Sequence, residues 1–349
     1  MKKIFFNKKK FINKINNFKL LFIMTLMLGT LISINSNNWF NAWMGMEINL
    51  LSFIPLMLNQ KKSSNSMMMY FIVQAMASSM IIFLMMTLKI ELNLNKLNFM
   101  ISIIQLSLLI KLGAAPFHWW TPKIILNLNW KMSLTFLTWQ KITPIILLNS
   151  SSTNNFMIYL SSIISIIMGA ILGMNQTLIK LIMIYSSINH TGWMLMTIML
   201  STSLMNFYFI IYSIMNLMIC LMMNNYNINN INENFKNNNQ SLIMKMMFMS
   251  MFLSLGGMPP MLGFLPKMLV LLLMMSNNMY IESFIFILMA SITLSFYINP
   301  MLSMFLLTKF NNKWNNKNMQ MNKSWIMFTI INLIMSLMTL PLIIKIFLY

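Results

Sequence analysis

A succession of long apolar runs constrains this chain more than any other feature. A membrane-spanning helix needs about 20 mainly apolar residues, and only helices and closed barrels pair every backbone N–H and C=O inside a bilayer. The runs predict an all-α polytopic membrane protein with about eleven transmembrane helices. They cover 20–35, 39–58, 67–88, 98–119, 131–149, 155–173, 177–199, 203–223, 242–275, 279–307 and 325–346.

The composition excludes several classes of protein. Of 349 residues, 58% are hydrophobic and 8% charged, whereas soluble domains carry about 25% charged residues. A soluble enzyme, a nucleic-acid-binding domain and a disordered tail are therefore excluded. One cysteine rules out an internal disulfide and a cysteine-ligated iron–sulfur cluster. Two histidines cannot ligate two haems. The 46 methionines are scattered along every span, which favours apolar filling over copper binding.

Lysine placement predicts the orientation. All 24 basic residues are lysine, and with the N-terminus inside, sixteen lie in inside segments and three in outside segments. The positive-inside rule then places the N-terminus on the matrix or cytoplasmic side and the C-terminus opposite. Seven lysines lie in residues 1–19. This extension lacks a convincing cleavage site and is interpreted as a tail before the first span.

Two Gly/Pro interruptions indicate an internal repeat. The run 242–275 contains Gly-Gly-Met-Pro-Pro at 256–260, which predicts two half-helices. A similar interruption follows Lys111, five spans earlier, and an odd offset inverts the second copy relative to the first. The predicted divisions are a basic extension at 1–19, a first five-helix repeat at 20–149, a second at 155–307 with an Asn-rich loop at 224–240, and a loop with the last helix at 308–349.

Four charged residues lie deep within predicted spans. Such a charge costs at least about 2.5–3.5 kcal/mol on insertion scales, and the residues are Glu47, Lys111, Lys141 and Lys267. One interpretation is structural, with lysines that reach an interface or a static Glu47–Lys111 pair. The other is a proton path, since burial favours a neutral lysine and a nearby carboxylate favours a charged one. The depth of Lys111 and Lys141 favours the path.

Three further residues are possible relays. His118 and His190 titrate near neutral pH in water, although a lone histidine in a packed span is as often simply hydrogen-bonded. His190 follows Tyr-Ser-Ser-Ile-Asn, whose hydroxyls suit water, and is the better candidate. Lys180, near the start of its span, fits a relay or an interfacial anchor equally. Lys245 is interpreted as an anchor.

Five segments carry a family resemblance. They are GMEINLLSFIPL (45–56), LLIKLGAAPFHWWTP (108–122), TWQKITP (138–144), NQTLIKLIMIYSSINHTGWM (175–194) and LSLGGMPPMLGFLPKMLVL (253–271). Together they resemble the subunit 2 family of mitochondrial NADH–ubiquinone oxidoreductase (respiratory complex I), of an insect-like or invertebrate kind, and more widely the antiporter-like proton-translocation family.

The resemblance implies two inverted five-helix repeats with two broken helices. It also implies eleven spans, because animal mitochondrial chains lack the first three of fourteen. Glu47 would pair with Lys111, Lys141 would be the central lysine and Lys267 the terminal one. The implied activity is proton translocation across the mitochondrial inner membrane by a core subunit of NADH:ubiquinone reductase.

The resemblance also implies which cofactors and neighbouring subunits accompany this chain. This chain would bind no cofactor, while flavin, iron–sulfur clusters and ubiquinone would lie in partner subunits. The neighbours would be antiporter-like subunit 4, small subunit 4L, the lateral helix of subunit 5, nuclear-encoded accessory subunits and a phospholipid such as cardiolipin, with no nucleic acid. A stand-alone cation/proton antiporter of the same fold is the alternative, and a purely structural spacer is disfavoured by the buried charges.

Overall fold

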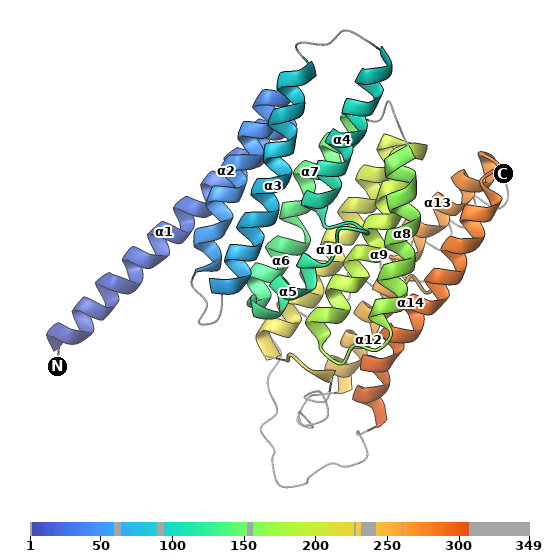
Figure 1. The fold of residues 1–349 in the computed structure, drawn as a ribbon. Coiled ribbons are helices and arrows are strands. Elements are labelled where there is room, and N and C mark those ends of the chain that lie inside the picture. Colours follow the sequence, from blue (N-terminus) through green and yellow to red (C-terminus); the bar gives the residue numbers. More distant parts are fainter. Residues whose placement is uncertain are drawn as a thin grey trace.

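The computed structural model describes residues 2–58, 64–88, 94–151, 156–226, 228–231, 242–259 and 261–306. These residues form helices and one isolated bridge, Leu178–Asn230, and no strand, which confirms the all-α class (Figure 1). The helices are α1 (Lys2–Ile34), α2 (Trp39–Met57), α3 (Ser64–Leu88), α4 (Leu94–Leu112), α5 (Trp120–Asn127), α6 (Trp130–Leu137), α7 (Trp139–Ser150), α8 (Phe156–Gly173), α9 (Ile179–Leu200), α10 (Thr202–Tyr226), α12 (Leu242–Gly256), α13 (Phe264–Ser276) and α14 (Tyr280–Leu306).

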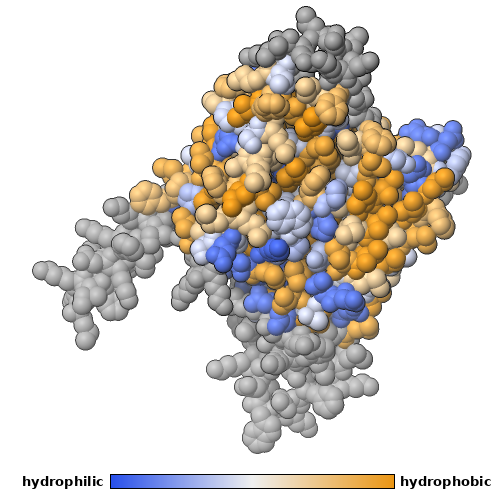
Figure 2. Space-filling view, viewed as in Figure 1, coloured by the Kyte–Doolittle hydropathy of each residue, from blue (hydrophilic) through white to orange (hydrophobic). Residues whose placement is uncertain are grey.

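Four of the described helices are long and apolar enough to cross a membrane on their own. They are α3, α8, α10 and α14, and shorter apolar helices lie at 18–34, 99–112, 247–256 and 264–276. Hydrophobic side chains cover most of the face in Figure 2, as expected of a surface that meets lipid. The chain is thus a multi-pass membrane protein. The predicted final span at 325–346 lies outside the described residues.

One helix covers both the predicted extension and the predicted first span. α1 runs without interruption from Lys2 to Ile34. The segment holds no proline, and its first glycine is Gly29, so no residue in it ends the helix early.

Both predicted breaks are present and have the same geometry. α4 is followed by Gly113 at φ 69° and α12 by Gly257 at φ 79°. Ala114 N–H donates to Leu109 O, and Met258 N–H donates to Leu253 O. This six-to-one hydrogen bond after a left-handed glycine is the Schellman helix end.

A third interruption was not predicted. The run 131–149 forms two helices, α6 and α7, on either side of Thr138. Thr138 Oγ1 donates to Leu134 O at 2.8 Å, a bond back to the preceding turn that bends helices. Lys141 N–H then bonds Thr138 O, three residues back, so the chain tightens immediately before Lys141.

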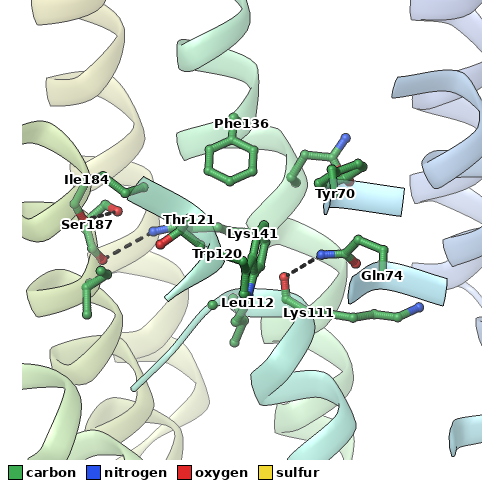
Figure 3. A pocket seen from close by; sticks show the side chains of 13 residues that line it. Tyr70, Gln74, Lys111, Leu112, Trp120, Thr121, Phe136, Lys141, Ile184 and Ser187 are labelled. Atoms are coloured by element: carbon green, nitrogen blue, oxygen red, sulfur yellow. Dashed lines mark hydrogen bonds between the residues drawn. The ribbon is translucent and has the colours of Figure 1, made fainter. Parts of the chain in front are cut away.

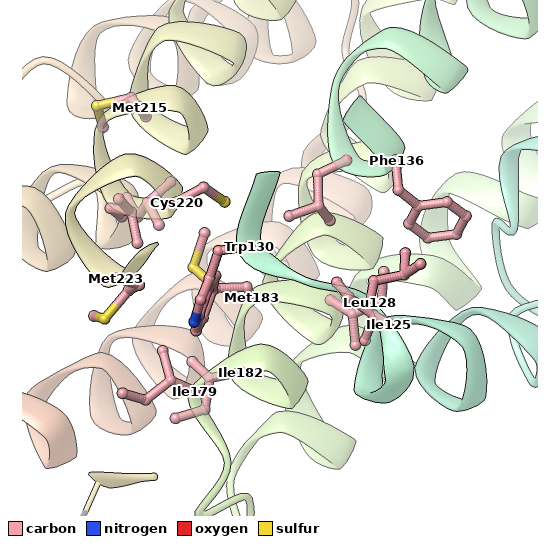
Figure 4. Close-up of a cluster of buried hydrophobic side chains, with 14 of the residues drawn as sticks. Ile125, Leu128, Trp130, Phe136, Ile179, Ile182, Met183, Met215, Cys220 and Met223 are labelled. Atoms are coloured by element: carbon pink, nitrogen blue, oxygen red, sulfur yellow. The ribbon is translucent and has the colours of Figure 1, made fainter. Parts of the chain in front are cut away.

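The apolar core is divided into two clusters along the helix axes. One cluster contains Trp130, Met183 and Cys220 (Figure 4), and the other contains Leu109 and Trp193. On α9 the first cluster takes residues 179–184 and the second 193–198, which leaves buried polar residues at 186–191 between them. Gln74 on α3 and Lys141 on α7 line one cavity together with Ser187 of this stretch, and all three are buried. A polar layer therefore crosses the middle of the bundle.

Candidate functional site

Lys111 lies in this layer at the broken end of α4. Its side chain is 7% exposed, and its Nζ contacts Met46 Sδ on α2 at 3.6 Å. Its carbonyl, which α4 leaves free by ending at Leu112, accepts a hydrogen bond from Gln74 Nε2 at 3.3 Å. The helix break thus places both a buried ammonium and a backbone acceptor in the layer.

Glu47 lies one residue beyond Met46 on α2. It acts electrostatically on Lys111, and its Oε1 is buried without a hydrogen-bond partner. A carboxylate oxygen of this kind is costly to keep charged unless a cation lies nearby. Lys111, whose Nζ contacts the neighbouring Met46, is the cation that interacts electrostatically with Glu47.

A small cavity lies between Lys111 and Lys141. It has about 20 Å³ available to water, enough for about one molecule. In Figure 3 the two lysine side chains flank it and their ammonium groups point in opposite directions. Tyr70 Oη donates to Gln140 Oε1 at 3.2 Å, and Gln140 Nε2 donates to Asn49 Oδ1 at 3.1 Å. Two members of this hydrogen-bonded chain, Tyr70 and Gln140, therefore line the cavity.

Lys141 faces α9 and α10. Its Nζ donates to Ser187 O at 3.2 Å and to Tyr212 Oη at 3.3 Å, and the side chain is 5% exposed. The break at Thr138 precedes it by three residues, and the Tyr212 hydroxyl donates to Leu137 O at 3.2 Å. The α6–α7 interruption thus supplies the acceptor that holds the tyrosine beside Lys141.

His190 lies between the last two lysines. Lys141 and Lys267 both lie near enough to act electrostatically on it, and the backbone of Leu255 lies beside it. Its Nδ1 and Tyr208 Oη are 2.8 Å apart, and its ring centroid is 5.3 Å from that of Tyr212. The histidine thus joins the surroundings of Lys141 to the end of α12.

Lys267 lies on α13 and folds back onto the end of α12. Its Nζ donates to Gly256 O at 2.7 Å and approaches Leu255 O at 3.5 Å. It also lies 5.9 Å from the Trp193 ring centroid. Gly257 has a positive φ, which favours glycine, and a Cβ there would lie 3.1 Å from this Nζ, so a larger residue would displace the lysine side chain.

The structure thus brings together Glu47, Lys111, Lys141, His190 and Lys267, and leaves two predicted residues elsewhere. His118 lies in the loop between α4 and α5, and its buried Nδ1 has no hydrogen-bond partner. Lys180 lies at the start of α9, where Nζ donates to Leu128 O at 2.6 Å. The described side chains do not include Lys245.

Several polar members of the layer were not predicted from the sequence. They are Asn49, Tyr70, Gln74, Gln140, Tyr208 and Tyr212. A lone amide such as Gln74 in the middle of an apolar run was the sequence feature that could have identified a buried polar position. An amide without a hydrogen-bond partner is costly in a membrane, so such a residue needs a partner. Its partner, the Lys111 carbonyl, is fixed only by the packing of α3 against α4.

Sequence comparison gives strong matches along nearly the whole chain. The family described as NADH:quinone oxidoreductase/Mrp antiporter, TM, matches residues 36–295. NADH-ubiquinone oxidoreductase chain 2 of Anopheles gambiae is 41% identical, over 90% of this chain and 94% of that one. The Aedes aegypti protein of the same name is also 41% identical, over 94% and 97%, and the Mus musculus protein 37%, over 91% and 95%.

Solved structures show the same fold at low sequence identity. A chain of respiratory complex I from Thermus thermophilus superposes with a TM-score of 0.80 at 16% identity, over 92% of this chain and 78% of that one. A chain of the Mrp complex from a Dietzia species gives 0.68 at 14% identity, over 81% and 60%. The chain therefore belongs to the NADH:quinone oxidoreductase/Mrp antiporter family and, within it, to NADH-ubiquinone oxidoreductase chain 2.

Proposed function

We propose that this chain is a proton-translocating membrane-arm subunit of NADH:ubiquinone oxidoreductase in the mitochondrial inner membrane. The observation that carries the proposal is the polar layer, in which Glu47, Lys111, Lys141, His190 and Lys267 follow one another between two apolar clusters. Each proton moved against 100 mV takes up about 2.3 kcal/mol. Buried lysines whose charge depends on their neighbours can respond to energies of that size.

In the proposed transfer, protons move between lysines that alternate between charged and neutral forms. A change in the charge near Glu47 alters how strongly Lys111 holds its proton. Water in the small cavity, with Tyr70 and Gln140, connects Lys111 to Lys141. The Tyr212 hydroxyl and His190 connect Lys141 to the carbonyl pair that binds Lys267. A positive charge that arrives at one lysine repels the next, so protons move in sequence.

We also propose a membrane topology, a location for the cofactors and a set of neighbouring subunits. We infer eleven spans in two inverted five-helix repeats, with the N-terminus in the matrix, because lysine placement and both broken helices support this topology. Flavin, iron–sulfur clusters and ubiquinone are assigned to partner subunits. Subunits 4 and 4L, the lateral helix of subunit 5, nuclear-encoded accessory subunits and cardiolipin are the proposed neighbours. The chain's likeness to an Mrp chain keeps a stand-alone cation/proton antiporter as the alternative.

Two measurements test the proposal. On a native gel of gently solubilised membranes, the chain should migrate with NADH dehydrogenase activity, and migration alone as a small species would favour the antiporter. In an assembled relative with the same residues, Lys111→Met or Glu47→Gln should lower proton pumping by at least about tenfold, the effect of about 1.4 kcal/mol. NADH oxidation by uncoupled membranes is the control, and unchanged pumping would remove both residues from the path.

A further inference from the structure

Trp193 on α9 lies against Lys267, the last lysine of the polar layer. The indole is fully buried, and the Lys267 Nζ lies over it, 5.9 Å from the ring centroid. The carbonyls of Gly256 and Leu255 contact the same ammonium. A tryptophan face within about 6 Å stabilises an ammonium relative to the neutral amine, and the effect is larger where water is excluded. The ring therefore contributes to how firmly Lys267 holds its proton.

Two contacts set the orientation of this ring. The Trp193 Nε1–H donates to Asn189 Oδ1 at 3.1 Å, and the two residues are four apart, so they lie on the same face of α9. Phe286 of α14 packs edge-on, with ring centroids 4.8 Å apart and ring planes at 77°, a preferred arrangement of aromatic pairs. The hydrogen bond is the more directional contact, because it fixes the edge of the indole that carries the nitrogen.

Asn189 is in turn attached to the neighbouring helix α8. Its side chain is 2% exposed, and its Nδ2 donates to Ile166 O at 3.3 Å. Two glycines bring the helices close enough for this bond. A Cβ on Gly169 would lie 2.7 Å from the Asn189 N, and one on Gly192 would lie 2.8 Å from Ser162 O. A buried amide is costly without partners, so the two hydrogen bonds of Asn189 hold the indole to a fixed point on α8.

We propose that Asn189 is a positioning residue for proton transfer at Lys267. It holds the face of Trp193 over the ammonium and so favours the charged form of the lysine. The amide carries no proton itself and acts through the indole. This inference deepens the proposed function and rests on Lys267 as a member of the proton path. Without the oriented ring, Lys267 would bind its proton more weakly and would be reloaded less completely at alkaline pH.

His190 is the neighbour whose titration could be confused with that of Lys267. It changes charge near neutral pH in water, and Lys267 acts on it electrostatically. A lysine that is charged less often repels the imidazolium less, so loss of the oriented ring moves the titration of His190 to higher pH and that of Lys267 to lower pH. Among the described residues, the other titratable side chains near this part of α13 are Tyr208 and Tyr212 on α10, Tyr297 on α14 and, in the first turn of α14, Glu282, which accepts a hydrogen bond from Tyr159. The end of α12 faces Lys267 with backbone carbonyls.

A double-mutant cycle in an assembled complex with these residues tests the proposal. Protons pumped per NADH oxidised are measured from weakly acidic to alkaline pH for Asn189→Leu, Trp193→Phe and the double variant. Each single variant should move the alkaline limb of the profile to lower pH by about half a unit, a fall of roughly threefold in proton affinity. The two shifts should not add, because the amide acts through the indole N–H that Trp193→Phe removes. Trp119→Phe is the matched control, since Trp119 lies 5.7 Å from the ammonium of Lys123 at an exposed position, and it should leave the profile unchanged.

The contrary results are distinct from one another. Unmoved limbs in the single variants would show that the ring does not influence Lys267, and a shift to higher pH would assign the effect to His190. Additive shifts would show that Asn189 acts without the indole, and an equal shift with Trp119→Phe would show a general effect of tryptophan loss. Each of these results overturns the proposal. If Asn189→Leu does not assemble, Asn189→Ala, which adds no bulk, replaces it with the same expected shift.

Lys267→Gln separates this inference from the proposed function. A strong loss of pumping in Lys267→Gln, with unmoved limbs in the Asn189 and Trp193 variants, overturns the positioning role alone. Retained pumping in Lys267→Gln removes the lysine from the proton path, and the positioning role with it.

Discussion

The two broken helices have one backbone design and place their cations differently. Residues 113–123 and 257–267 both follow the pattern Gly-x-x-Pro-x-x-x-x-x-Pro-Lys, and both helices end in the same Schellman hydrogen bonds. In the second segment the final lysine, Lys267, is buried against Gly256 O. In the first, the matching Lys123 is exposed over Trp119, and the buried cation is Lys111, which precedes the break.

This difference determines how each cation is held. Lys267 binds the carbonyl end of α12, where the helix dipole favours a positive charge. The equivalent end of α4 is bonded instead by the neutral amide of Gln74, so the Lys111 ammonium faces Met46 and the charge of Glu47. One cation is thus fixed by backbone, and the other responds to a carboxylate. Variants at these positions test this contrast.

The largest expected effect compares the two lysines that the repeated pattern aligns. Lys267→Gln removes the ammonium from the end of α12 and should lower proton pumping by at least about tenfold, a barrier change of about 1.4 kcal/mol. Lys123→Gln should leave pumping within about twofold, because an exposed charge contributes little. Pumping is measured by fluorescence quenching in proteoliposomes. Equal losses in the two variants would show that the aligned positions have equal roles.

A second pair of variants tests the two positive-φ glycines. A Cβ at Gly113 would collide with Thr121 Cγ2, in a β-branched side chain, whereas one at Gly257 would lie 2.9 Å from Cδ of the flexible Lys267. Either alanine also costs about 1–2 kcal/mol in the left-handed conformation. Gly113→Ala should therefore reduce assembly of the complex on native gels. Gly257→Ala should assemble but pump several-fold less, because it displaces the Lys267 ammonium.

Relief of the collision provides the control for that pair. Thr121→Ser removes the Cγ2 that the new Cβ would strike while keeping a hydroxyl. Combined with Gly113→Ala, it should restore much of the lost assembly and leave only the backbone strain. No recovery in the double variant would mean that the positive φ, rather than Thr121, sets the requirement for glycine at 113.

The sequence predicted these breaks and their lysines because both depend on local chemistry. Glycine and proline interrupt a helix wherever they stand, and a lysine deep in an apolar run is costly whatever surrounds it. The partners of those lysines depend on how distant helices pack. Gln74 and Lys111 are 37 residues apart, and Lys141 and Tyr212 are 71 apart. No periodicity within one segment specifies such a pairing. The hydrogen bond of Lys180 to Leu128 O, 52 residues away in the sequence, could not be predicted for the same reason.

A smaller effect is expected at the amide that binds the end of α4. Gln74→Leu leaves the Lys111 carbonyl without its donor, and a lost buried hydrogen bond costs about 1–3 kcal/mol. We expect a lower thermal midpoint for the complex and a moderate loss of pumping. Gln74→Glu is the informative companion, because a carboxylate next to Lys111 would hold its proton more tightly and shift the pH optimum of pumping. An unchanged pH optimum would place Gln74 outside the electrostatic control of Lys111.

The smallest effect is expected at the interruption that contains no glycine. Thr138→Val keeps the shape of the side chain and removes the Oγ1 bond to Leu134 O, but that carbonyl still accepts from Thr138 N–H at 3.0 Å. The loss should therefore be no more than about 1 kcal/mol, measured as a small decrease in thermal midpoint with pumping retained. Substantial loss of pumping would instead show that the bend before Lys141 controls its contact with Tyr212. The α6–α7 junction would then be a third functional break, made by a hydroxyl where the other two use glycine.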